Sequence, residues 1–342
     1  MTKQSHKIIR CTNCVLPETF PGIKFNEEGI CNLCLSFKGK AKLKKKKQEY
    51  RIRFEDLIQK YKGKSTYDSL ISYSGGKDST YTLAVLKESY GLNILAVTFD
   101  NGFLPERTFK NIKNVVGNLG IDHILFKPRF DVLKKIFAAC ANENIFPPQT
   151  LRRASSICTS CMAIVKFNTL RIALEKDIPF IMFGWSPGQI PITSSIMKNN
   201  PKFLRLSQKS LYDPLHKLVG SKINPYFLEE KNFEETYHFP YNISPLVFLD
   251  YDENQIVQKI NEFGWEAPKD VDAHSTNCLL NSFANVVHKE RHGYHPYVFE
   301  LAKLVREGYL DRSVALQKLS QLENIKTVEL VKRTLGQLHP KN

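Results

Sequence analysis

A pair of glycines followed by lysine, aspartate and serine lies at residues 75–79, between a β-rich run at residues 68–74 and a helical pattern at residues 79–91. Two adjacent glycines let the backbone approach an anion closely, and the first amides of the following helix can donate to its oxygens. In an open parallel sheet, ligands bind beyond the carboxyl ends of the strands, which is where this loop falls. The loop therefore predicts an α/β fold with a phosphate-binding site after its first strand.

The polar residues of this loop and of the helical turn after it are candidate phosphate ligands. The hydroxyl groups of Ser74, Ser79 and Thr80 can donate hydrogen bonds, and Lys77 can neutralise negative charge. Asp78 fits an anion site if it holds Mg²⁺ or orients a bound group. A plain turn is the alternative interpretation, and the position between a strand and a helix disfavours it.

Strands and helices alternate along the middle of the chain. The predicted elements are strands at residues 93–100, 123–127 and 179–184, and helices at residues 109–120, 132–143 and 162–176. Such alternation favours right-handed crossovers and a doubly wound, mostly parallel sheet with helices on both faces. These elements form a predicted α/β domain at residues 65–245. After this domain, amphipathic patterns predict a helical C-terminal region at residues 246–342.

Two Cys-x-x-Cys pairs near the N-terminus predict a metal site. Cys11 and Cys14 form the first pair, and Cys31 and Cys34 the second, with sixteen residues between the pairs. Four thiolates can surround Zn²⁺ as a tetrahedron, and so small a segment has little other core. Residues 1–37 are therefore predicted to form a zinc ribbon, with unpaired thiols as the alternative.

Basic residues concentrate in the stretch that follows the ribbon. Residues 38–53 contain a run of lysines, and the whole chain carries a net charge of +15. Such a run can bind nucleic acid by releasing counterions, so RNA is a candidate partner. The other interpretation is a solvated basic helix at residues 38–64 that links the ribbon to the α/β domain.

Length and composition are those of a globular protein. The chain has 342 residues, enough for two domains, with ordinary apolar (42%) and charged (24%) fractions. We find no apolar run of the roughly 18 residues that span a bilayer and no apolar signal segment. We therefore expect a cytoplasmic protein without a membrane partner, in which seven patterned cysteines indicate metal or redox chemistry rather than disulfides.

The Ser-Gly-Gly-x-Asp-Ser motif resembles the signature of the PP-loop ATP pyrophosphatases, which have the adenine nucleotide alpha-hydrolase-like (HUP-like) fold. The resemblance covers about residues 65–245 and implies that the loop holds the pyrophosphate of ATP, with residues 97–102 beside the adenosine. It implies that a substrate oxygen attacks the α-phosphorus, and that a second nucleophile then displaces AMP. The ATP-binding residues in this interpretation are Ser74, Gly75, Gly76, Lys77, Asp78, Ser79, Thr80, Phe99, Asp100 and Gly184.

Three further cysteines bear on the second nucleophile. Cys158 and Cys161 form a Cys-x-x-Cys pair, and Cys278 lies at the entrance to the helical tail. Thiolates hold iron–sulfur clusters, and three of them leave one iron with an open position. The set resembles that of the iron–sulfur-dependent thiolation enzymes of the PP-loop group, which implies a 4Fe-4S cluster that delivers sulfur.

Three other interpretations of these cysteines stay open. Cys158 and Cys161 can form a persulfide pair at a helix N-terminus. They can also bind a second zinc ion together with Cys278 and His274. Cys278 can instead be a buried structural thiol, as we expect for Cys140 inside an apolar helix.

A second resemblance favours nitrogen as the atom that replaces the oxygen of the substrate. Residues 11–34 and 294–316 resemble the PP-loop N-acetyl sugar amidotransferases of surface-polysaccharide synthesis. This implies that ammonia from a partner glutaminase converts an acetamido group into an acetamidino group. The third cysteine of the set above is not typical of that group, so it favours sulfur.

The residues after the fourth predicted strand differ from the RNA-thiolating pattern. Residues 183–191 lack the Gly-His-Asn stretch and the acidic residues of that group, so we expect no carboxylate for Mg²⁺ or substrate there. This favours a different or smaller acceptor. Trp185 and Gln189 can stack on and hydrogen-bond to a heterocycle or sugar, although Trp185 can equally be a packing residue.

A group of histidines follows in the helical tail. His288, His292 and His295 lie beside Arg291 and Tyr294, with spacings of four and three that can line one helical face. They can bind an anionic substrate or act as a general acid. A polar surface helix is the alternative.

These patterns together predict an ATP-dependent transferase that adenylates a carbonyl-type oxygen, releases pyrophosphate and replaces the oxygen by sulfur. Its predicted catalytic residues are Cys158, Cys161, Cys278 and Asp78, and its cofactors are ATP, Mg²⁺, Zn²⁺ and a 4Fe-4S cluster. The alternatives are amidation of an N-acetyl sugar and, from another class, a zinc-ribbon RNA-binding module that binds ATP without turnover. Candidate partners are a small-molecule or nucleoside-type acceptor, a sulfur-carrier protein, a glutaminase, and a second copy of this chain in a homodimer.

Overall fold

Six strands form a single sheet at the centre of the protein. The computed structural model describes residues 8–234, 238–269, 271 and 275–336. The strands are β1 (Ser69–Ser72), β2 (Ile94–Phe99), β3 (Asp122–Phe126), β4 (Phe180–Phe183), β5 (Ile196–Lys198) and β6 (Tyr241–Ile243). Their order is β3-β2-β1-β4-β6-β5, and every neighbouring pair is parallel except β5 with β6. This confirms the predicted mostly parallel α/β fold.

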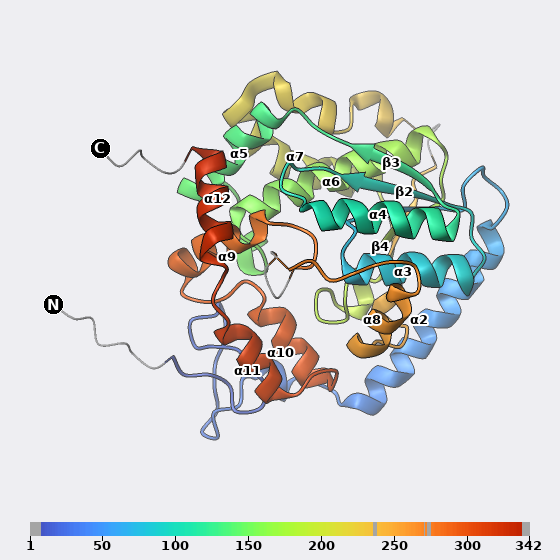
Figure 1. Ribbon diagram of the computed structural model, residues 1–342. Helices are drawn as coiled ribbons and strands as arrows, with labels where there is room; N and C mark the ends of the chain where they lie inside the picture. The colour runs from blue at the N-terminus through green and yellow to red at the C-terminus, as the bar shows by residue number, and fades with distance from the viewer. Residues whose placement is uncertain (1–7, 235–237, 270, 272–274, 337–342) are drawn as a thin grey trace.

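Helices cover both faces of the sheet (Figure 1). One face is covered by α5 (Phe130–Asn142), α6 (Ser156–Glu175), α7 (Pro201–Val219), α9 (Leu280–His292) and α12 (Ile325–Leu335). The other face is covered by α2 (Lys40–Tyr61), α3 (Lys77–Glu88), α4 (Glu106–Leu119) and α8 (Glu253–Asn261). Side chains of consecutive strand residues point to opposite faces of the sheet. Leu70 packs into the core beside α6, and Ile71 packs into the core beside α3. Because both faces are covered there, β2 and β4 are mostly apolar and buried.

The two ends of the chain share a third core. The N-terminal residues, with helix α1 (Asn32–Leu35), pack against α10 (Val298–Glu307) and α11 (Arg312–Ser320), as Figure 1 shows. The ring of Phe20 lies 5.1 Å from that of Tyr294 and 5.4 Å from that of Phe299. The ribbon therefore gains from the tail the apolar contacts that its own few residues cannot supply. Short 3₁₀ helices complete the fold at Thr150–Arg152, Ile192–Ser194, Gly220–Tyr226, Glu230–Phe233 and Pro245–Val247.

Helix α6 differs from the prediction that no segment is long and apolar enough to span a bilayer. Within the described residues it is long and apolar enough to cross a bilayer by length and composition, although inspection of the sequence indicated no such run. Most of it is buried inside the protein, where Ile164, Phe167 and Leu170 belong to the central core. It is therefore a core helix. The predicted domain boundaries at residues 37, 64 and 245 stay predictions.

Candidate active site and metal centre

The strand order reverses beside the glycine loop. The chain runs outward from β1 through β2 to β3 and then returns to the other side of β1 with β4. In a doubly wound sheet, such a switch point opens a crevice at the carboxyl ends of the two central strands. The loop after β1 and the loop after β4 are therefore the two walls of the candidate active site.

Glycine at position 75 is required by the shape of the first loop. Its φ of +74° lies in the left-handed region, and a Cβ there would lie 2.7 Å from a side-chain carbon of Ile112. The indole Nε1 of Trp265 donates a 3.0 Å hydrogen bond to the Gly75 carbonyl. The backbone of the loop is therefore held from behind by the segment that follows α8.

The hydroxyl groups predicted to bind phosphate bond to the loop itself in this structure. Ser74 Oγ lies 3.0 Å from Ser79 Oγ, which donates to the Gly76 carbonyl over 3.1 Å. Thr80 is fully buried and donates to the same carbonyl over 2.8 Å. Thr80 and Ser79 thus shape the loop from inside, whereas Ser74 is exposed.

The charged residues of the loop form an ion-pair network with the segment leading into α8. Lys77 Nζ lies 3.0 Å from Asp78 Oδ1 and 3.3 Å from Glu253 Oε1, and it donates to the Tyr251 hydroxyl over 3.2 Å. Burial alone would lower the pKa of Lys77, but the nearby Asp78 and Glu253 carboxylates outweigh burial and raise it. Lys77 is therefore a permanent cation beside the loop.

Two residues of the tail lie on the loop. The backbone N–H of Lys77, at the first turn of α3, donates a 3.0 Å hydrogen bond to Thr276 Oγ1. The side-chain amide of Asn277 donates to the Ser74 carbonyl over 3.3 Å. Because amides at a helix N-terminus are natural phosphate donors, the Thr276 hydroxyl occupies a donor that a phosphate would use.

The loop after β4 touches the glycine loop directly. A Cβ on Gly184 would lie 2.6 Å from the backbone nitrogen of Ser79, so only glycine fits at this approach. The Gln189 side chain accepts a 2.7 Å hydrogen bond from the Ser186 backbone and closes this loop on itself. Trp185 stacks on Phe183, with ring centroids 6.4 Å apart. Gln189 and Trp185 thus have internal roles in this structure.

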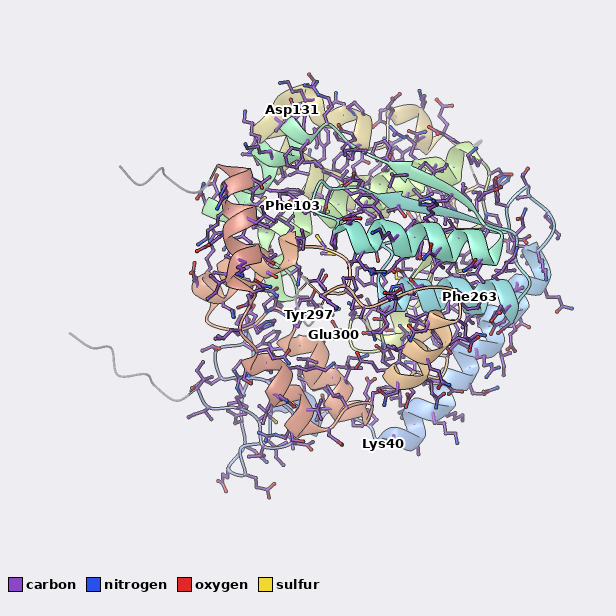
Figure 2. The ribbon with its side chains drawn as sticks, in the orientation of Figure 1. Lys40, Phe103, Asp131, Phe263, Tyr297 and Glu300 are labelled. Carbon is purple, nitrogen blue, oxygen red and sulfur yellow. The ribbon has the colours of Figure 1, made fainter. Side chains whose placement is uncertain are left out.

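The expectation that this point lacks a carboxylate was wrong. Helix α10 supplies Glu300, whose Oε1 accepts a 2.7 Å hydrogen bond from Ser186 Oγ. Burial, with a contribution from the charge of Asp78, raises the pKa of Glu300 to about 7, although the bond from Ser186 opposes the shift. Figure 2 labels Glu300 beside Tyr297 near the centre of the molecule. This part of the molecule therefore does not disfavour an RNA acceptor.

Cys158, Cys161 and Cys278 lie around two asparagines. The Asn101 side-chain amide lies 3.3 Å from Cys278 Sγ and 3.7 Å from Cys161 Sγ, and it donates to both. Cys158 Sγ lies 3.9 Å from Asn281 Oδ1, which also accepts a 3.2 Å bond from the Tyr297 hydroxyl. All three thiols are half-buried, and burial raises the pKa of Cys161 and Cys278.

The spacing of this set bears on what it can hold. Among residues 8–234, 238–269, 271 and 275–336, only the four ribbon cysteines place three or more ligand atoms within 4.8 Å of one another, as a single ion requires. Cys158, Cys161 and Cys278 are further apart, and His274 lies outside the described residues. The spacing of the set therefore does not match that of a single-ion site. Cys140 is fully buried, as expected of a core residue.

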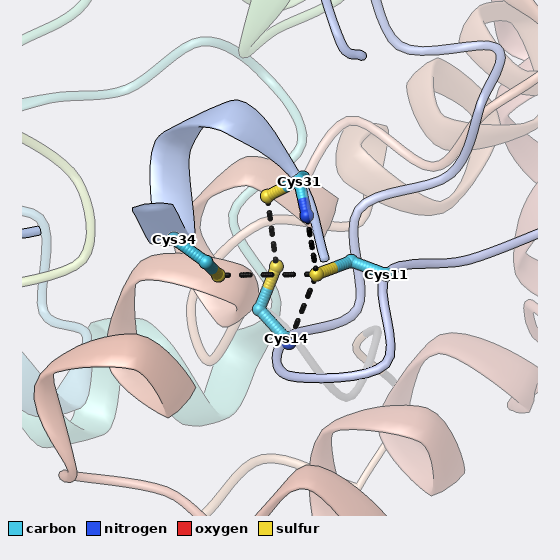
Figure 3. A group of neighbouring side chains, drawn as sticks. All are labelled: Cys11, Cys14, Cys31 and Cys34. Atoms are coloured by element: carbon cyan, nitrogen blue, oxygen red, sulfur yellow. Dashed lines mark hydrogen bonds between the residues drawn. The ribbon is translucent and has the colours of Figure 1, made fainter. Parts of the chain in front are cut away.

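The ribbon cysteines form a four-thiol cluster capable of binding a metal (Figure 3). All four are buried, and the Cys11 sulfur accepts from the backbone N–H groups of Cys14 (3.4 Å) and Cys31 (3.2 Å). Burial would raise the pKa of Cys11, but these backbone donors outweigh burial and lower the pKa to about 7. Burial raises the pKa of Cys14 and raises that of Cys31 to about 11, so Cys11 is the one of these three that most readily becomes the thiolate that binds a metal ion.

Asp100, the acidic residue that follows β2, makes a hydrogen bond and an ion pair within the protein. Asp100 is buried, and it accepts a 2.8 Å bond from the Gly102 backbone and lies 3.1 Å from Lys127 Nζ. Phe99, half-buried, lies 6.0 Å from Phe126 between ring centroids. Both residues stand at the carboxyl edge of the sheet, beside β1, where the adenosine was expected.

The histidine group does not form a surface for ligands. His288 is buried and its ring lies 4.4 Å from that of His292, while His295 lies 3.7 Å from Glu323. Burial lowers the pKa of His288 to about 3, so this imidazole is neutral and does not attract an anion. Arg291 donates to the Cys140 carbonyl at the end of α5. The alternative prediction, a polar surface helix, was also wrong for His288, because this side chain is buried.

Tyr251, Thr276 and Glu300 were not predicted from the sequence, and Asn101 was predicted beside the adenosine rather than beside the cysteines. Asn101 carried a signal, because it directly follows a predicted strand at the carboxyl edge of the sheet. The other three come from the tail, where no local pattern separates a site residue from any other polar residue.

Comparison with known proteins finds a distant relative of the chain. No protein-family model matches the chain. A relative from Methanocaldococcus jannaschii, the uncharacterized protein MJ1599, is 24% identical over 318 residues, which cover 92% of this chain and 94% of the relative. The strand order of this chain and its Ser-Gly-Gly-Lys-Asp-Ser loop at the switch point resemble those of the adenine nucleotide alpha-hydrolase-like fold.

Similar solved structures are distant from this chain. U34-tRNA thiolase NcsA from Methanococcus maripaludis, solved with its [4Fe-4S] cluster, is 15% identical with a TM-score of 0.38, and the match covers 97% of this chain and 90% of that one. NMN synthetase from Francisella tularensis is 11% identical with a TM-score of 0.36, and the match covers 88% of this chain and 98% of that one.

Proposed function

We propose that this protein is an ATP-dependent transferase that adenylates a carbonyl-type oxygen of an acceptor, releases pyrophosphate and replaces the oxygen by sulfur. The observation that carries the proposal is the position of Cys278. It lies two residues after Thr276, which contacts the glycine loop, and it shares the Asn101 amide with Cys161. The glycine loop and a group of thiols therefore adjoin at the carboxyl edge of the sheet.

The first step joins the acceptor to AMP. The acceptor oxygen attacks the α-phosphorus of ATP, a new P–O bond forms, and the bond from the α-phosphorus to the pyrophosphate breaks. The first amides of α3 and the charge of Lys77 stabilise the leaving pyrophosphate. Asp78 is the carboxylate of the loop that can hold Mg²⁺ or orient the phosphates.

An amide-type acceptor must lose its N–H proton in this step, because its oxygen becomes the oxygen of an O-adenylate. Glu300 lies at the crevice, held by Ser186, and its pKa of about 7 lets it take a proton near neutral pH. We therefore assign proton removal to Glu300. Its place on the tail helix α10 gives the C-terminal region a part in the reaction.

The second step replaces the oxygen. Sulfur as hydrosulfide adds to the activated carbon, and the bond from that carbon to the AMP oxygen then breaks. Cys158, Cys161 and Cys278 would hold an iron–sulfur cluster, which when bound would carry this sulfur on its open iron. The Asn101 amide hydrogen-bonds to two of the sulfurs and orients them.

The alternatives make different use of the same residues. Amidation needs no thiol near the loop, so it gives Cys158, Cys161 and Cys278 no role. An RNA-binding module would use the lysine-rich side of α2, whose Phe54 and Ile58 pack on the sheet. Zinc in the ribbon, a cytoplasmic location, a sulfur-carrier or glutaminase partner and a homodimer belong to the proposal as further expectations.

The iron content and visible absorption of protein purified without oxygen test the proposal. We expect a brown protein with iron and with zinc in its ribbon, whose iron and colour are lost in Cys278→Ala while the zinc stays. Cys140→Ala is the matched control, because this fully buried thiol lies outside the set and should leave the iron in place. A colourless wild-type protein that holds only zinc would contradict sulfur transfer and favour amidation.

A further inference from the structure

A pocket lies where the ribbon, helix α10 and the loop after β4 meet. Its volume is about 260 Å³, and the residues that matter in its lining are Leu33, Phe37, Arg153, Phe299, Lys303 and Arg306. They come from separate parts of the chain. The ribbon contributes the first two, the segment before α6 contributes Arg153, and α10 contributes the rest. The pocket therefore exists only in the folded chain.

Its charge is positive. No carboxylate lines it, and its three cations include two guanidinium groups. Arg153 donates to the Gln189 carbonyl, and Arg306 contacts Cys34 Sγ at 4.0 Å. Within the part of the chain that the structure describes, their other N–H groups have no hydrogen-bond partner, although each guanidinium carries five such donors. Lys303 is occupied by the Ile190 carbonyl (3.0 Å) and is paired with Glu307 (3.3 Å), so the net positive charge of the pocket comes from the two arginines.

Apolar and aromatic side chains form the rest of the pocket. The guanidinium of Arg153 lies 4.7 Å from the ring centre of Phe299, and Leu33 and Phe37 belong to the ribbon side. A planar or apolar group can pack here while an anion contacts the arginines. Guanidinium groups bind phosphate through paired donors, so a phosphate ester with a ring fits this combination. The volume is below the 300 Å³ or so of a typical ligand pocket, which indicates that it holds one part of a larger ligand.

The pocket shares a wall with the candidate active site. Gln189, whose carbonyl binds Arg153, also closes the loop that carries Ser186, and Ser186 binds Glu300. Phe299 and Glu300 are neighbours on α10, one facing the pocket and the other bonded to the loop after β4. The pocket therefore lies next to the loop that holds Glu300.

We propose that this pocket binds the phosphate group of the acceptor, and that the acceptor is a small phosphate ester. The role of the ligand as acceptor rests on the proposed function, but its binding does not. Binding requires neither iron nor turnover, so a failure of sulfur transfer and a failure of this pocket give different results.

Calorimetric titration with phenyl phosphate tests the pocket, with phenol as the neutral probe. We expect phenyl phosphate to bind wild-type protein and phenol not to bind. Arg153→Gln and Arg306→Gln should each weaken phenyl phosphate at least tenfold. Arg205→Gln is the matched control, because Arg205 lies 4.4 Å from the ring centre of Phe233, outside the pocket, and should change nothing. The zinc content of Arg306→Gln is measured as well, since Arg306 contacts a ribbon cysteine.

Three results would overturn the proposal. The first is phenyl phosphate affinity that both arginine substitutions leave unchanged. The second is binding that survives these substitutions and is lost in Gly184→Ala, which would place the phosphate in the glycine loop. The third is binding of a single-stranded uridine decamer but not of phenyl phosphate, with Arg306→Gln weakening the decamer, which would assign the pocket to RNA.

Discussion

Ser186 donates a 2.7 Å hydrogen bond to Glu300, although the two residues are 114 positions apart in the chain. Ser186 belongs to the loop after β4, and Glu300 belongs to a helix that packs on the N-terminal ribbon. This bond brings a tail carboxylate to the carboxyl edge of the sheet, close enough to Asp78 to feel its charge. The crevice of the α/β domain is therefore completed by the C-terminal region.

Glu300→Gln should slow pyrophosphate release by about a hundredfold, since a positioned general base contributes at least about that much. The wild-type rate should rise with pH through an apparent pKa of about 7, because only the carboxylate form accepts a proton. The variant should lack this rise. Glu290→Gln, on an exposed position of α9, is the control and should keep the wild-type profile.

The same substitution has a consequence for stability. A carboxyl group whose pKa is raised to about 7 binds its proton more tightly in the folded chain than in the unfolded chain. Wild-type stability therefore falls as the pH rises from about 4.5 to 7, and Glu300→Gln should show less of this loss. Melting temperatures at pH 5 and pH 8 measure the difference. An equal pH dependence in both proteins would show that Glu300 is not buried against the loop.

Gly184→Ala should destabilise the protein and abolish ATP binding. Its Cβ would lie 2.6 Å from the backbone of Ser79, and a backbone at the start of a helix cannot move aside as a side chain can. Gly117→Ala is the control, because nothing lies within 4 Å of its Cβ position in α4. That substitution should raise stability by about 0.5 kcal/mol. ATP affinity by calorimetry and melting temperature distinguish the two, and unchanged ATP affinity in Gly184→Ala would contradict the close approach.

Thr276→Val should tighten pyrophosphate binding roughly two- to tenfold. The Thr276 hydroxyl accepts from the Lys77 backbone N–H over 3.0 Å, so a phosphate oxygen must displace it, and one such bond is worth about 1 kcal/mol. Valine keeps the shape and removes the acceptor. Ser275→Ala is the control, because the hydroxyl of Ser275 bonds to Asn277 rather than to the loop. Weaker pyrophosphate binding to Thr276→Val would show that the hydroxyl assists the ligand.

Cys31→Ser should remove the metal from the ribbon and loosen the end of the chain that packs on it. Arg312 of α11 donates to the carbonyl groups of Cys14 (2.8 Å) and Cys11 (3.0 Å), so the ribbon backbone and the tail helices depend on one another. We expect loss of about one zinc per chain and faster amide hydrogen exchange in α10 and α11. Cys140→Ala should retain the zinc. Full zinc content in Cys31→Ser would contradict a four-cysteine site.

Much of the central fold follows from short stretches of the chain. The predicted strand at residues 68–74 contains β1, and the predicted helix at residues 109–120 corresponds to α4 with Gly120 as its left-handed end. The cysteine spacing in the ribbon indicated a four-thiol cluster. These features are readable because strand and helix periodicity, turn residues and ligand spacing are properties of neighbouring residues.

Helical periodicity also predicted an exposed face for His288, and this prediction was wrong. Periodicity shows which residues share a helical face but not what covers that face, and in the folded chain His288 and His292 face Tyr294 instead of solvent. Buried position and neutral charge follow from that contact. The spacing of the histidines alone could not supply either property.

The local sequence specified the glycine loop, the β1–loop–α3 unit around it and the ribbon cysteines, because each depends on residues close together in the chain. The packing of distant segments specified the rest of the crevice: Glu300 against Ser186, Thr276 on Lys77, and Cys278 beside Cys161 around Asn101. Such contacts arise from the burial of whole helices on the sheet and ribbon. Their energy is spread over many apolar side chains, so no short pattern near Glu300 or Thr276 marks them.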